Sequence, residues 1–153
     1  MKFLVSLNFF LAFLFTEKPF QKRLKQDFDV QKITWNDLKD VHFKKKFNID
    51  LAMFYLYPNF GPKVTMLNGR TVEIKGYTIP IDSEGNFVVS QNPNSMCYFC
   101  GKSGPESMIQ LKFSGKHQRY KTDEIKTFKG TLRLNATNVQ ELNYILEEAE
   151  SVD

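Results

Sequence analysis

The chain has 153 residues, of which 42% are hydrophobic, 14% aromatic and 25% charged, and its formal net charge at pH 7 is +4. This length suits one domain with a single core, and the composition excludes a chain that is disordered throughout. The basic excess gathers between Lys18 and Lys46, whereas the residues from Glu141 onward are mainly acidic. No nucleic-acid-binding motif accompanies the lysines, so nucleic acid is not expected as a partner.

Residues 1–17 are predicted to be a signal peptide or an N-terminal anchor. Lys2 is followed by an apolar run to Phe15 that only Ser6 and Asn8 interrupt, which is the pattern of an export signal. The run is shorter than the roughly 20 residues that a membrane-spanning helix needs. No clean small-x-small cleavage triplet and no lipobox cysteine follow it, so a retained segment is the alternative to a cleaved one. The protein is therefore expected to be exported, and to be periplasmic or associated with a membrane.

Residues 18–32 are polar and charged without clear periodicity, and they are predicted to link the export segment to a single domain over residues 33–153. The domain is expected to begin with a short helix from Thr34 to Val41. Asp37 stands three residues after Thr34, which is the spacing of a capping box, and apolar residues then recur at helical spacing. This helix is predicted to cover one end of the core.

Most of the remaining chain alternates between apolar and polar residues, which is typical of strands. Turn-forming residues separate the predicted strands at Pro58–Pro62, Asn68–Arg70 and Asp82–Gly85. The predicted strands are residues 42–57, 63–67, 71–81, 86–90, 108–113, 125–134 and 143–150. Gly76 and Gly130 stand inside two of them, where glycine is typical of a bulge or a barrel bend. The sequence predicts an all-β fold, namely a small, partly open barrel of the OB-like type with the short N-terminal helix packed on it.

The stretch from Ser95 to Ser107 is the densest group of reactive side chains and contains both cysteines, Cys97 and Cys100. Their C-x-x-C spacing is used for haem attachment, for thiol–disulfide exchange and for metal binding. Haem attachment is excluded, because Gly101 stands where a histidine is required. Thiol–disulfide exchange is an alternative, but the glycines and the proline that follow are a poor start for the helix that lowers a cysteine pKa.

Metal binding, with zinc as the metal, is the leading interpretation of the cysteine pair. A closed zinc site needs four ligands and the chain has no second C-x-x-C motif. The further candidate ligands are Glu106, His117 and His42, of which Glu106 and His117 are predicted to join Cys97 and Cys100. Glu106 could equally order its loop, and His117 could be a free surface histidine. Two cysteines in an exported protein also fit a short disulfide that stiffens a loop.

Several short segments occur together in a fixed order along the chain. They are Ile33-Thr-Trp-Asn-Asp-Leu, Tyr57-Pro-Asn-Phe-Gly, Gly76-Tyr-Thr-Ile-Pro, Met96-Cys-Tyr-Phe-Cys-Gly and Gly104-Pro-Glu-Ser. In this order they resemble an uncharacterised family of small exported domains in lipoproteins and periplasmic proteins of Bacteroidetes-type bacteria, from about Ile33 to the C-terminus. The family has no settled activity, but the resemblance implies a link to ABC-type transporters and metal uptake. The lipobox cysteine that is usual in its lipoprotein members is absent here.

The sequence therefore predicts an exported accessory or binding protein, with zinc binding in connection with transport as the expected role. A membrane transporter or another envelope protein is the expected partner, and the membrane itself is expected only through an uncleaved N-terminal segment. Catalysis is not expected, because the chain has no serine nucleophile elbow, no evident carboxylate pair and no phosphate-binding glycine loop. The alternatives are a thiol–disulfide redox protein and a plain interaction module with a structural disulfide.

Overall fold

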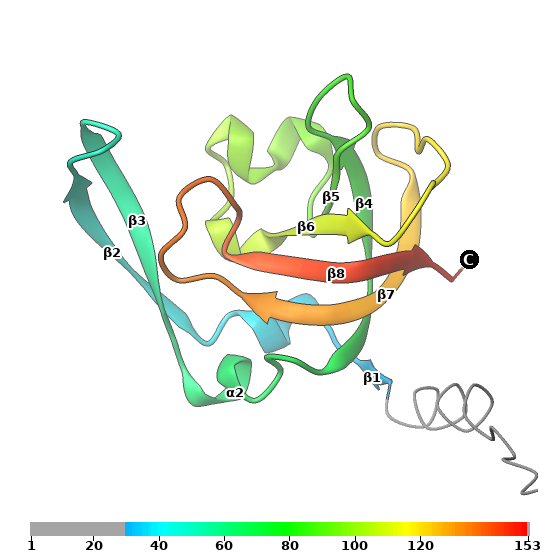
Figure 1. Cartoon of the computed structure of the whole chain (residues 1–153), viewed down its shortest axis with the longest axis horizontal. Helices are drawn as coiled ribbons and strands as arrows, with labels where there is room; N and C mark the ends of the chain where they lie inside the picture. Colours follow the sequence, from blue (N-terminus) through cyan, green and yellow to red (C-terminus); the bar gives the residue numbers. More distant parts are fainter. Residues whose placement is uncertain (1–29, 153) are drawn as a thin grey trace, which may run out of the picture.

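The computed structural model describes residues 30–152, which form a closed five-stranded β-barrel with a two-stranded hairpin projecting from it (Figure 1). The barrel strands are β4 (Thr71–Pro80), β5 (Phe87–Ser90), β6 (Met108–Phe113), β7 (Ile125–Leu134) and β8 (Tyr144–Ser151). The hairpin strands are β2 (Val41–Asn48) and β3 (Met53–Phe60), and a short strand β1 (Gln31–Lys32) precedes them. The helices are η1 (Trp35–Leu38), α2 (Pro62–Thr65), η2 (Asn94–Met96), η3 (Tyr98–Cys100) and η4 (Pro105–Ser107).

The predicted export segment, residues 1–17, and most of the predicted linker lie outside the described residues. The end of that linker is not irregular, because β1 pairs in parallel with β4, with Gln31 beside Val72. Within residues 30–152, no helix is both long enough and apolar enough to cross a membrane.

The barrel closes because β4 has two partners along its length. Its first part, Thr71–Tyr77, pairs antiparallel with β7, and its last part, Tyr77–Pro80, pairs antiparallel with β5. The complete order is β4-β5-β6-β8-β7 and back to β4, and β6 with β8 is the parallel pair among these neighbours. The prediction of an all-β barrel is confirmed, but the prediction that it is partly open is wrong, since the β4–β7 pairing leaves no gap.

Two glycines make the close approach of the barrel strands possible. A Cβ atom on Gly76 would lie 2.5 Å from the Ser90 carbonyl oxygen, and one on Gly130 would lie 2.6 Å from the Glu147 carbonyl oxygen. The pairing of β7 with β8 also shifts register between Lys129 and Thr131, on either side of Gly130. Any larger residue would force the strands apart, so glycine is required at both positions for close strand packing. The predicted irregularity is confirmed at Gly130 by this register shift, whereas the pairing of β4 is regular at Gly76.

Side chains from all five barrel strands fill the interior. The core includes Val72, Ile74, Phe87, Val89, Ile109, Leu111, Phe128, Leu132 and Leu146. The turn η1 covers one end of this core with Leu38, whose carbonyl oxygen accepts a hydrogen bond of 2.8 Å from the Tyr144 hydroxyl. The sequence predicted a helix reaching Val41 at this place. The structure has one 3-10 turn, opened by the Thr34–Asp37 capping box.

The segment before β4 differs from the prediction. The predicted strand 42–57 is two strands, β2 and β3, joined by a turn. The predicted strand 63–67 is wrong, because the chain forms helix α2 there, with Pro62 at its first turn, a position that proline favours. There is consequently no hairpin at Asn68–Arg70, where the Asn68 side-chain oxygen accepts a hydrogen bond from the Leu134 backbone instead.

The predicted turn at Pro58–Pro62 is also wrong in its first part, because β3 continues to Phe60. Proline is tolerated in β3 because this strand pairs only with β2 and is an edge strand. The predicted closing strand at residues 143–150 is confirmed as β8, which pairs with both β6 and β7.

Candidate binding cleft

The connection between β5 and β6, residues 91–107, contains the cysteine pair and folds against the outside of the barrel. Phe87 and Val89 of β5 belong to the barrel core, so the alternating residues Val88 and Ser90 point outward. Both outward residues are nevertheless buried. The connection covers them with a second apolar cluster, whose buried members are Ile79, Val88, Cys97 and Met108.

The two cysteines differ in environment, and both are free thiols. Cys97 is fully buried in the second cluster, with its sulfur 3.8 Å from the Asn94 side-chain oxygen. Cys100 is exposed and its sulfur lies 3.2 Å from the Asn94 carbonyl oxygen. Desolvation, together with a hydrogen bond to Cys97, raises the pKa of Cys100. A raised pKa reduces the fraction of reactive thiolate, which is the opposite of what thiol–disulfide exchange needs.

The other two predicted zinc ligands lie in different surroundings. Glu106 belongs to η4, and its carboxylate folds back over Gly104, where a Cβ would lie 2.2 Å from an oxygen. His117 lies in the β6–β7 connection and stacks on Phe113 with ring centroids 3.7 Å apart. Within residues 30–152, no three or more His, Cys, Asp or Glu side chains come together as a group that could hold a metal ion. Zinc binding through Cys97, Cys100, Glu106 and His117 stays a prediction.

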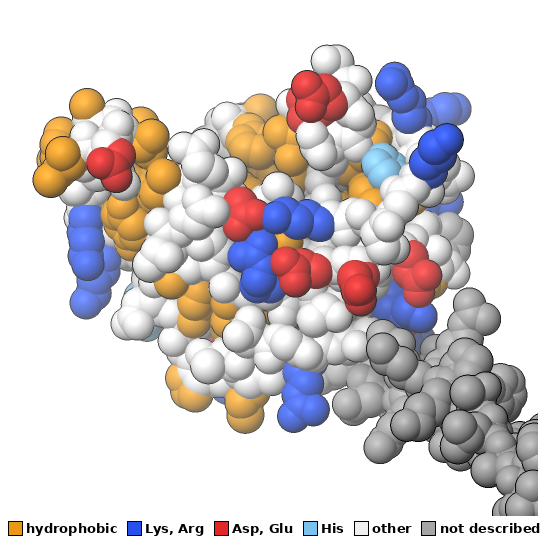
Figure 2. Space-filling model, in the orientation of Figure 1, with side chains coloured by type: hydrophobic (Ala, Val, Ile, Leu, Met, Phe, Trp, Pro, Cys, Tyr) orange, Lys and Arg blue, Asp and Glu red, His pale blue; other side chains and the backbone are white. Residues whose placement is uncertain are grey.

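A cleft of about 320 Å³ opens beside the cysteine-containing connection, on the side that faces the hairpin. Five separate segments of the chain contribute to it: β3, the β4–β5 turn, η3, β6 and the β7–β8 loop. Its lining residues are Tyr55, Ile81, Asp82, Asn86, Phe99, Gln110, Val139, Gln140, Glu141 and Leu142. Figure 2 shows hydrophobic side chains gathered over the cysteine-containing connection above β6.

The cleft presents apolar and aromatic surface to solvent. Phe99 is 53% exposed and Ile81 is 42% exposed, although both are large hydrophobic residues. Tyr55 reaches the cleft from the hairpin, and burial raises the pKa of its hydroxyl. Leu142 joins these residues from the β7–β8 loop and also packs against the second apolar cluster. The apolar surface of the cleft therefore comes from four separate segments of the chain.

The carboxylates in the lining are already engaged. Asp82 accepts hydrogen bonds from the backbone of Glu84, Gly85 and Asn86, and from the Asn86 side chain at 2.6 Å. The Asn86 side chain is the largest of the hydrogen-bonding causes that lower the pKa of Asp82. This carboxylate therefore orders the β4–β5 turn, and it does so as an anion at neutral pH.

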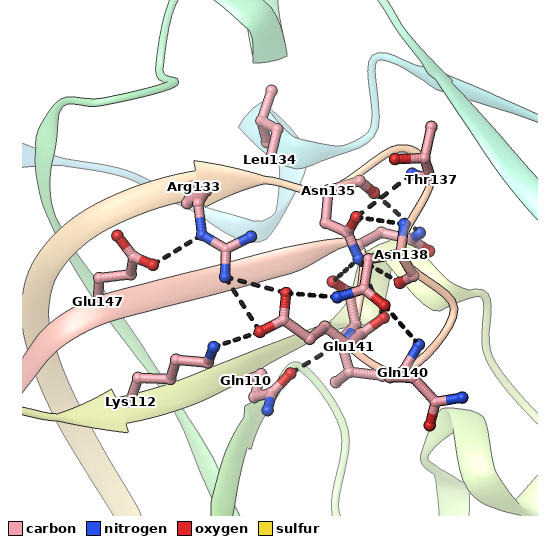
Figure 3. A network of polar contacts seen from close by, with 12 residues as sticks. Gln110, Lys112, Arg133, Leu134, Asn135, Thr137, Asn138, Gln140, Glu141 and Glu147 are labelled. Atoms are coloured by element: carbon pink, nitrogen blue, oxygen red, sulfur yellow. Dashed lines mark hydrogen bonds and ion pairs between the residues drawn. The ribbon is translucent and has the colours of Figure 1, made fainter.

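Glu141 is at the centre of a polar network that fixes the β7–β8 loop (Figure 3). Its carboxylate accepts hydrogen bonds from Lys112 of β6 and from Arg133 of β7, the latter at 3.1 and 3.2 Å. Arg133 also donates to Glu147 of β8 at 2.7 Å. Hydrogen bonding from Lys112, and then from Arg133, holds the pKa of Glu141 below its ordinary value. Because each charge has a partner of opposite sign, the network adds no net charge to the cleft.

Amide side chains complete the attachment of this loop to the barrel (Figure 3). The Asn135 amide donates to the carbonyl oxygens of Asn138, Glu141 and Leu142, at 2.7 to 3.2 Å. The Gln110 side-chain oxygen accepts a hydrogen bond of 3.1 Å from the Leu142 backbone. The Gln110 NH₂ group has no partner among the described residues, so it can donate to a molecule in the cleft.

Sequence reasoning missed this cleft, because its lining comes from five segments with no shared motif. Sequence reasoning singled out the two cysteines instead. Neither cysteine lines the cleft, but Phe99, which lies between them, does. One signal was available: in an OB-like barrel, ligands lie across the second and third strands and between the loops that flank them. This rule points to Gln110 and to the β4–β5 and β7–β8 loops.

Comparisons with known proteins give one structural neighbour and no family. No protein-family model matches the chain, and no curated protein matches its sequence. The chain is similar to the crystal structure of a DUF3299 family protein from Pseudomonas aeruginosa PAO1, with a TM-score of 0.49 and 15% sequence identity. The alignment covers 80% of this chain and 96% of that protein.

Proposed function

We infer that the barrel is of the OB-like type. In that fold the first strand pairs with the second and the fourth, and the third and fifth strands run parallel side by side. The order and direction of β4, β5, β6, β7 and β8 agree with these five places. The connection between the third and fourth strands, residues 114–124, carries no helix.

We propose that the protein is a non-enzymatic binding module that holds a peptide segment of a partner protein in the cleft lined by Tyr55, Phe99 and Gln110. The observation that carries this proposal is the position of the cleft. It lies at the outer surface of β6, between the β4–β5 turn and the β7–β8 loop, where OB-like barrels hold their ligands. The predicted export segment would make the partner an envelope protein.

The chemistry of the lining favours a peptide over a nucleic acid. Among residues 30–152, no lysine or arginine lines the cleft, whereas binding to nucleic acid depends on cations that meet phosphate groups. Tyr55, Phe99 and Ile81 offer an apolar surface of the kind that anchors a single large side chain. The Gln110 NH₂ group is placed to meet a backbone carbonyl of the same segment.

The test is a selection of random displayed peptides on the purified protein, followed by affinity measurements with the enriched sequences. Tyr55→Ala and Phe99→Ala should each weaken binding about tenfold or more, because aromatic anchors dominate such interfaces. Met66→Ala is the matched control, since Met66 is 68% exposed on the surface beyond α2 and lies outside the cleft. The proposal fails if the Phe99→Ala protein selects the same peptides with the same affinity. Binding of neutral oligosaccharides, lost in the same two variants, would replace the peptide with a sugar as the ligand.

A further inference from the structure

The outer half of the β2–β3 hairpin is a second surface, separate from the cleft. The base of the hairpin packs on the core through Phe60, but within residues 30–152 none of the side chains in the outer half is buried. The hairpin projects from the barrel at one side of the molecule (Figure 1). Not one residue from Val41 to Phe60 is buried, although this segment holds six of the 21 Phe and Tyr residues of the chain. A two-stranded hairpin is marginally stable in water unless something covers a face of it. The exposed aromatic side chains of the hairpin therefore indicate that another molecule or surface covers it.

The distal end of the hairpin is an apolar tip. Ile49 is 85% exposed, and Phe47, Met53 and Phe54 are each more than half exposed. Phe47 and Phe54 are cross-strand partners with ring centroids 5.4 Å apart. The turn between them is held by hydrogen bonds from Leu51 to the Asn48 side chain and from Ala52 to the Ile49 carbonyl. The tip thus presents its hydrophobic groups as one ordered wedge.

A basic and aromatic belt lies directly behind this tip. Lys44, Lys45 and Lys46 are all exposed, and Figure 2 shows basic side chains on the hairpin below its hydrophobic end. The Lys45 ammonium stands 5.0 Å from the centroid of the Phe54 ring, and the Lys46 ammonium stands 6.0 Å from that of Tyr57. With one acidic residue against three lysines, residues 41–60 carry a net charge of +2 (3 − 1).

We propose that the hairpin tip inserts into the interface of a membrane that contains anionic lipids. Apolar side chains at the end of an element, followed by tyrosine and lysine, match the order of acyl chains, interface and anionic headgroups in a bilayer. The occupant that this charge favours is a negatively charged surface. A second copy of the chain fits less well, because Lys44–Lys46 run along an exposed edge strand, where lysines oppose edge-to-edge pairing.

Asp50 is the acidic residue of the hairpin and lies in the turn at its tip. A carboxylate at this place opposes contact with anionic headgroups, so it provides a test of the orientation. Asp50→Asn should strengthen binding to anionic vesicles several-fold, because one repulsive charge is removed from the inserted end. In a hairpin that binds elsewhere than at its tip, this substitution would leave vesicle binding unchanged.

The main experiment measures binding of the full chain to vesicles of phosphatidylcholine with phosphatidylglycerol, and to vesicles of phosphatidylcholine alone. Ile49→Ser with Phe54→Ser should weaken binding to the anionic vesicles about tenfold or more. Replacement of Lys44, Lys45 and Lys46 by Gln should have a similar effect and remove most of the salt dependence. Met66→Ser is the apolar control, and replacement of the exposed Lys102, Lys116 and Lys121 by Gln is the charge control.

A second measurement separates the hairpin from any binding by residues 1–29, which all variants retain. Tryptophan at the tip, in Phe54→Trp, should be quenched by brominated lipids much more strongly than tryptophan in Met66→Trp, with Trp35 as a common background. Equal quenching of the two variants would overturn the proposal. So would a lipid-free dimer that Ile49→Ser with Phe54→Ser abolishes, because the hairpin would then be covered by a second copy.

Discussion

Two segments outside the barrel strands differ in how they pack against the barrel. They are the cysteine-containing connection at residues 91–107 and the β2–β3 hairpin at residues 41–60. The connection returns to the barrel and buries Cys97 in an apolar cluster on its outer face. The hairpin leaves the barrel and buries none of its residues. The segment with the most reactive groups is therefore packed against the barrel, whereas the segment that reads as a core strand is exposed. Residue type alone does not say which segment binds.

The largest difference is expected between aromatic residues of the barrel and of the hairpin. Phe128→Ala should lower the free energy of unfolding by ~3 to 5 kcal/mol, because it leaves a cavity in a fully buried site of the core. Phe54→Ala, the matched substitution at the hairpin tip, should change it by less than about 0.5 kcal/mol. Urea unfolding measures both. A comparable loss in the two variants would mean that the hairpin contributes to the stability of the barrel.

A smaller effect is expected within the cysteine pair. Cys97→Ser places a hydroxyl in the second apolar cluster and should cost about 1 to 3 kcal/mol. Cys100→Ser, at an exposed position, should be neutral within about 0.5 kcal/mol. The measurement is urea unfolding under reducing conditions, combined with metal analysis of the purified proteins. Equal losses in the two variants, together with bound zinc in the wild-type protein, would instead support the predicted zinc site.

The smallest effect is expected for the network that holds the β7–β8 loop at the cleft. The pKa of Glu141 is lowered from its model-compound value of 4.5, so its stabilisation is present above the unfolded pKa and is lost as pH falls through the folded pKa. Wild-type stability should therefore fall more steeply below about pH 4.5 than that of Glu141→Gln. At neutral pH the two should differ by about 1 kcal/mol or less.

Urea unfolding at a series of pH values checks this dependence on Glu141. Glu84→Gln is the control, because Glu84 lies in the exposed β4–β5 turn. If Glu141→Gln and the wild-type protein lost stability in parallel on acidification, the network would not be what holds the loop at low pH.

The barrel strands could be predicted from the sequence because the signals are local. Alternation of apolar and polar residues, bounded by turn residues, placed β4, β6 and β7 within one residue of their ends. The two internal glycines of β4 and β7 stand where neighbouring strands approach too closely for a Cβ to fit, and Gly130 also marks a register shift.

The same reasoning failed at the turn between β2 and β3 and at α2. Ile49, Leu51 and Met53 keep an alternation of two residues through the hairpin turn, which contains neither glycine nor proline. Ala52 adopts a positive φ of 50° in this turn. A glycine at this position would have indicated the turn in the sequence. In α2, the buried Val64 is followed three residues later by the buried Leu67, a spacing that fits a helix better than a strand.

The candidate site could be predicted only through the fold. The cysteine pair was recognised by residue type, but burial of one thiol depends on contacts between segments far apart in the chain. Tyr55, Phe99 and Gln110 belong to no common pattern, and only the tertiary fold brings the hairpin, η3 and β6 to one cleft. In the OB-like barrel that we propose, the β4–β5 and β7–β8 loops are the first places to search.

The base of the hairpin has a consequence for how this domain can vary. The Gly61 backbone N–H donates to the Asp40 carbonyl oxygen at 2.7 Å, so the chain enters and leaves the hairpin at adjacent points. A Cβ on Gly61 would lie 2.2 Å from the Asp40 side chain, so only glycine allows these two points to lie so close together. A short turn could therefore replace most of the hairpin without moving the barrel strands, and a different loop could be grafted in its place. The barrel is therefore a scaffold on which the hairpin can be exchanged for another loop without a change of fold.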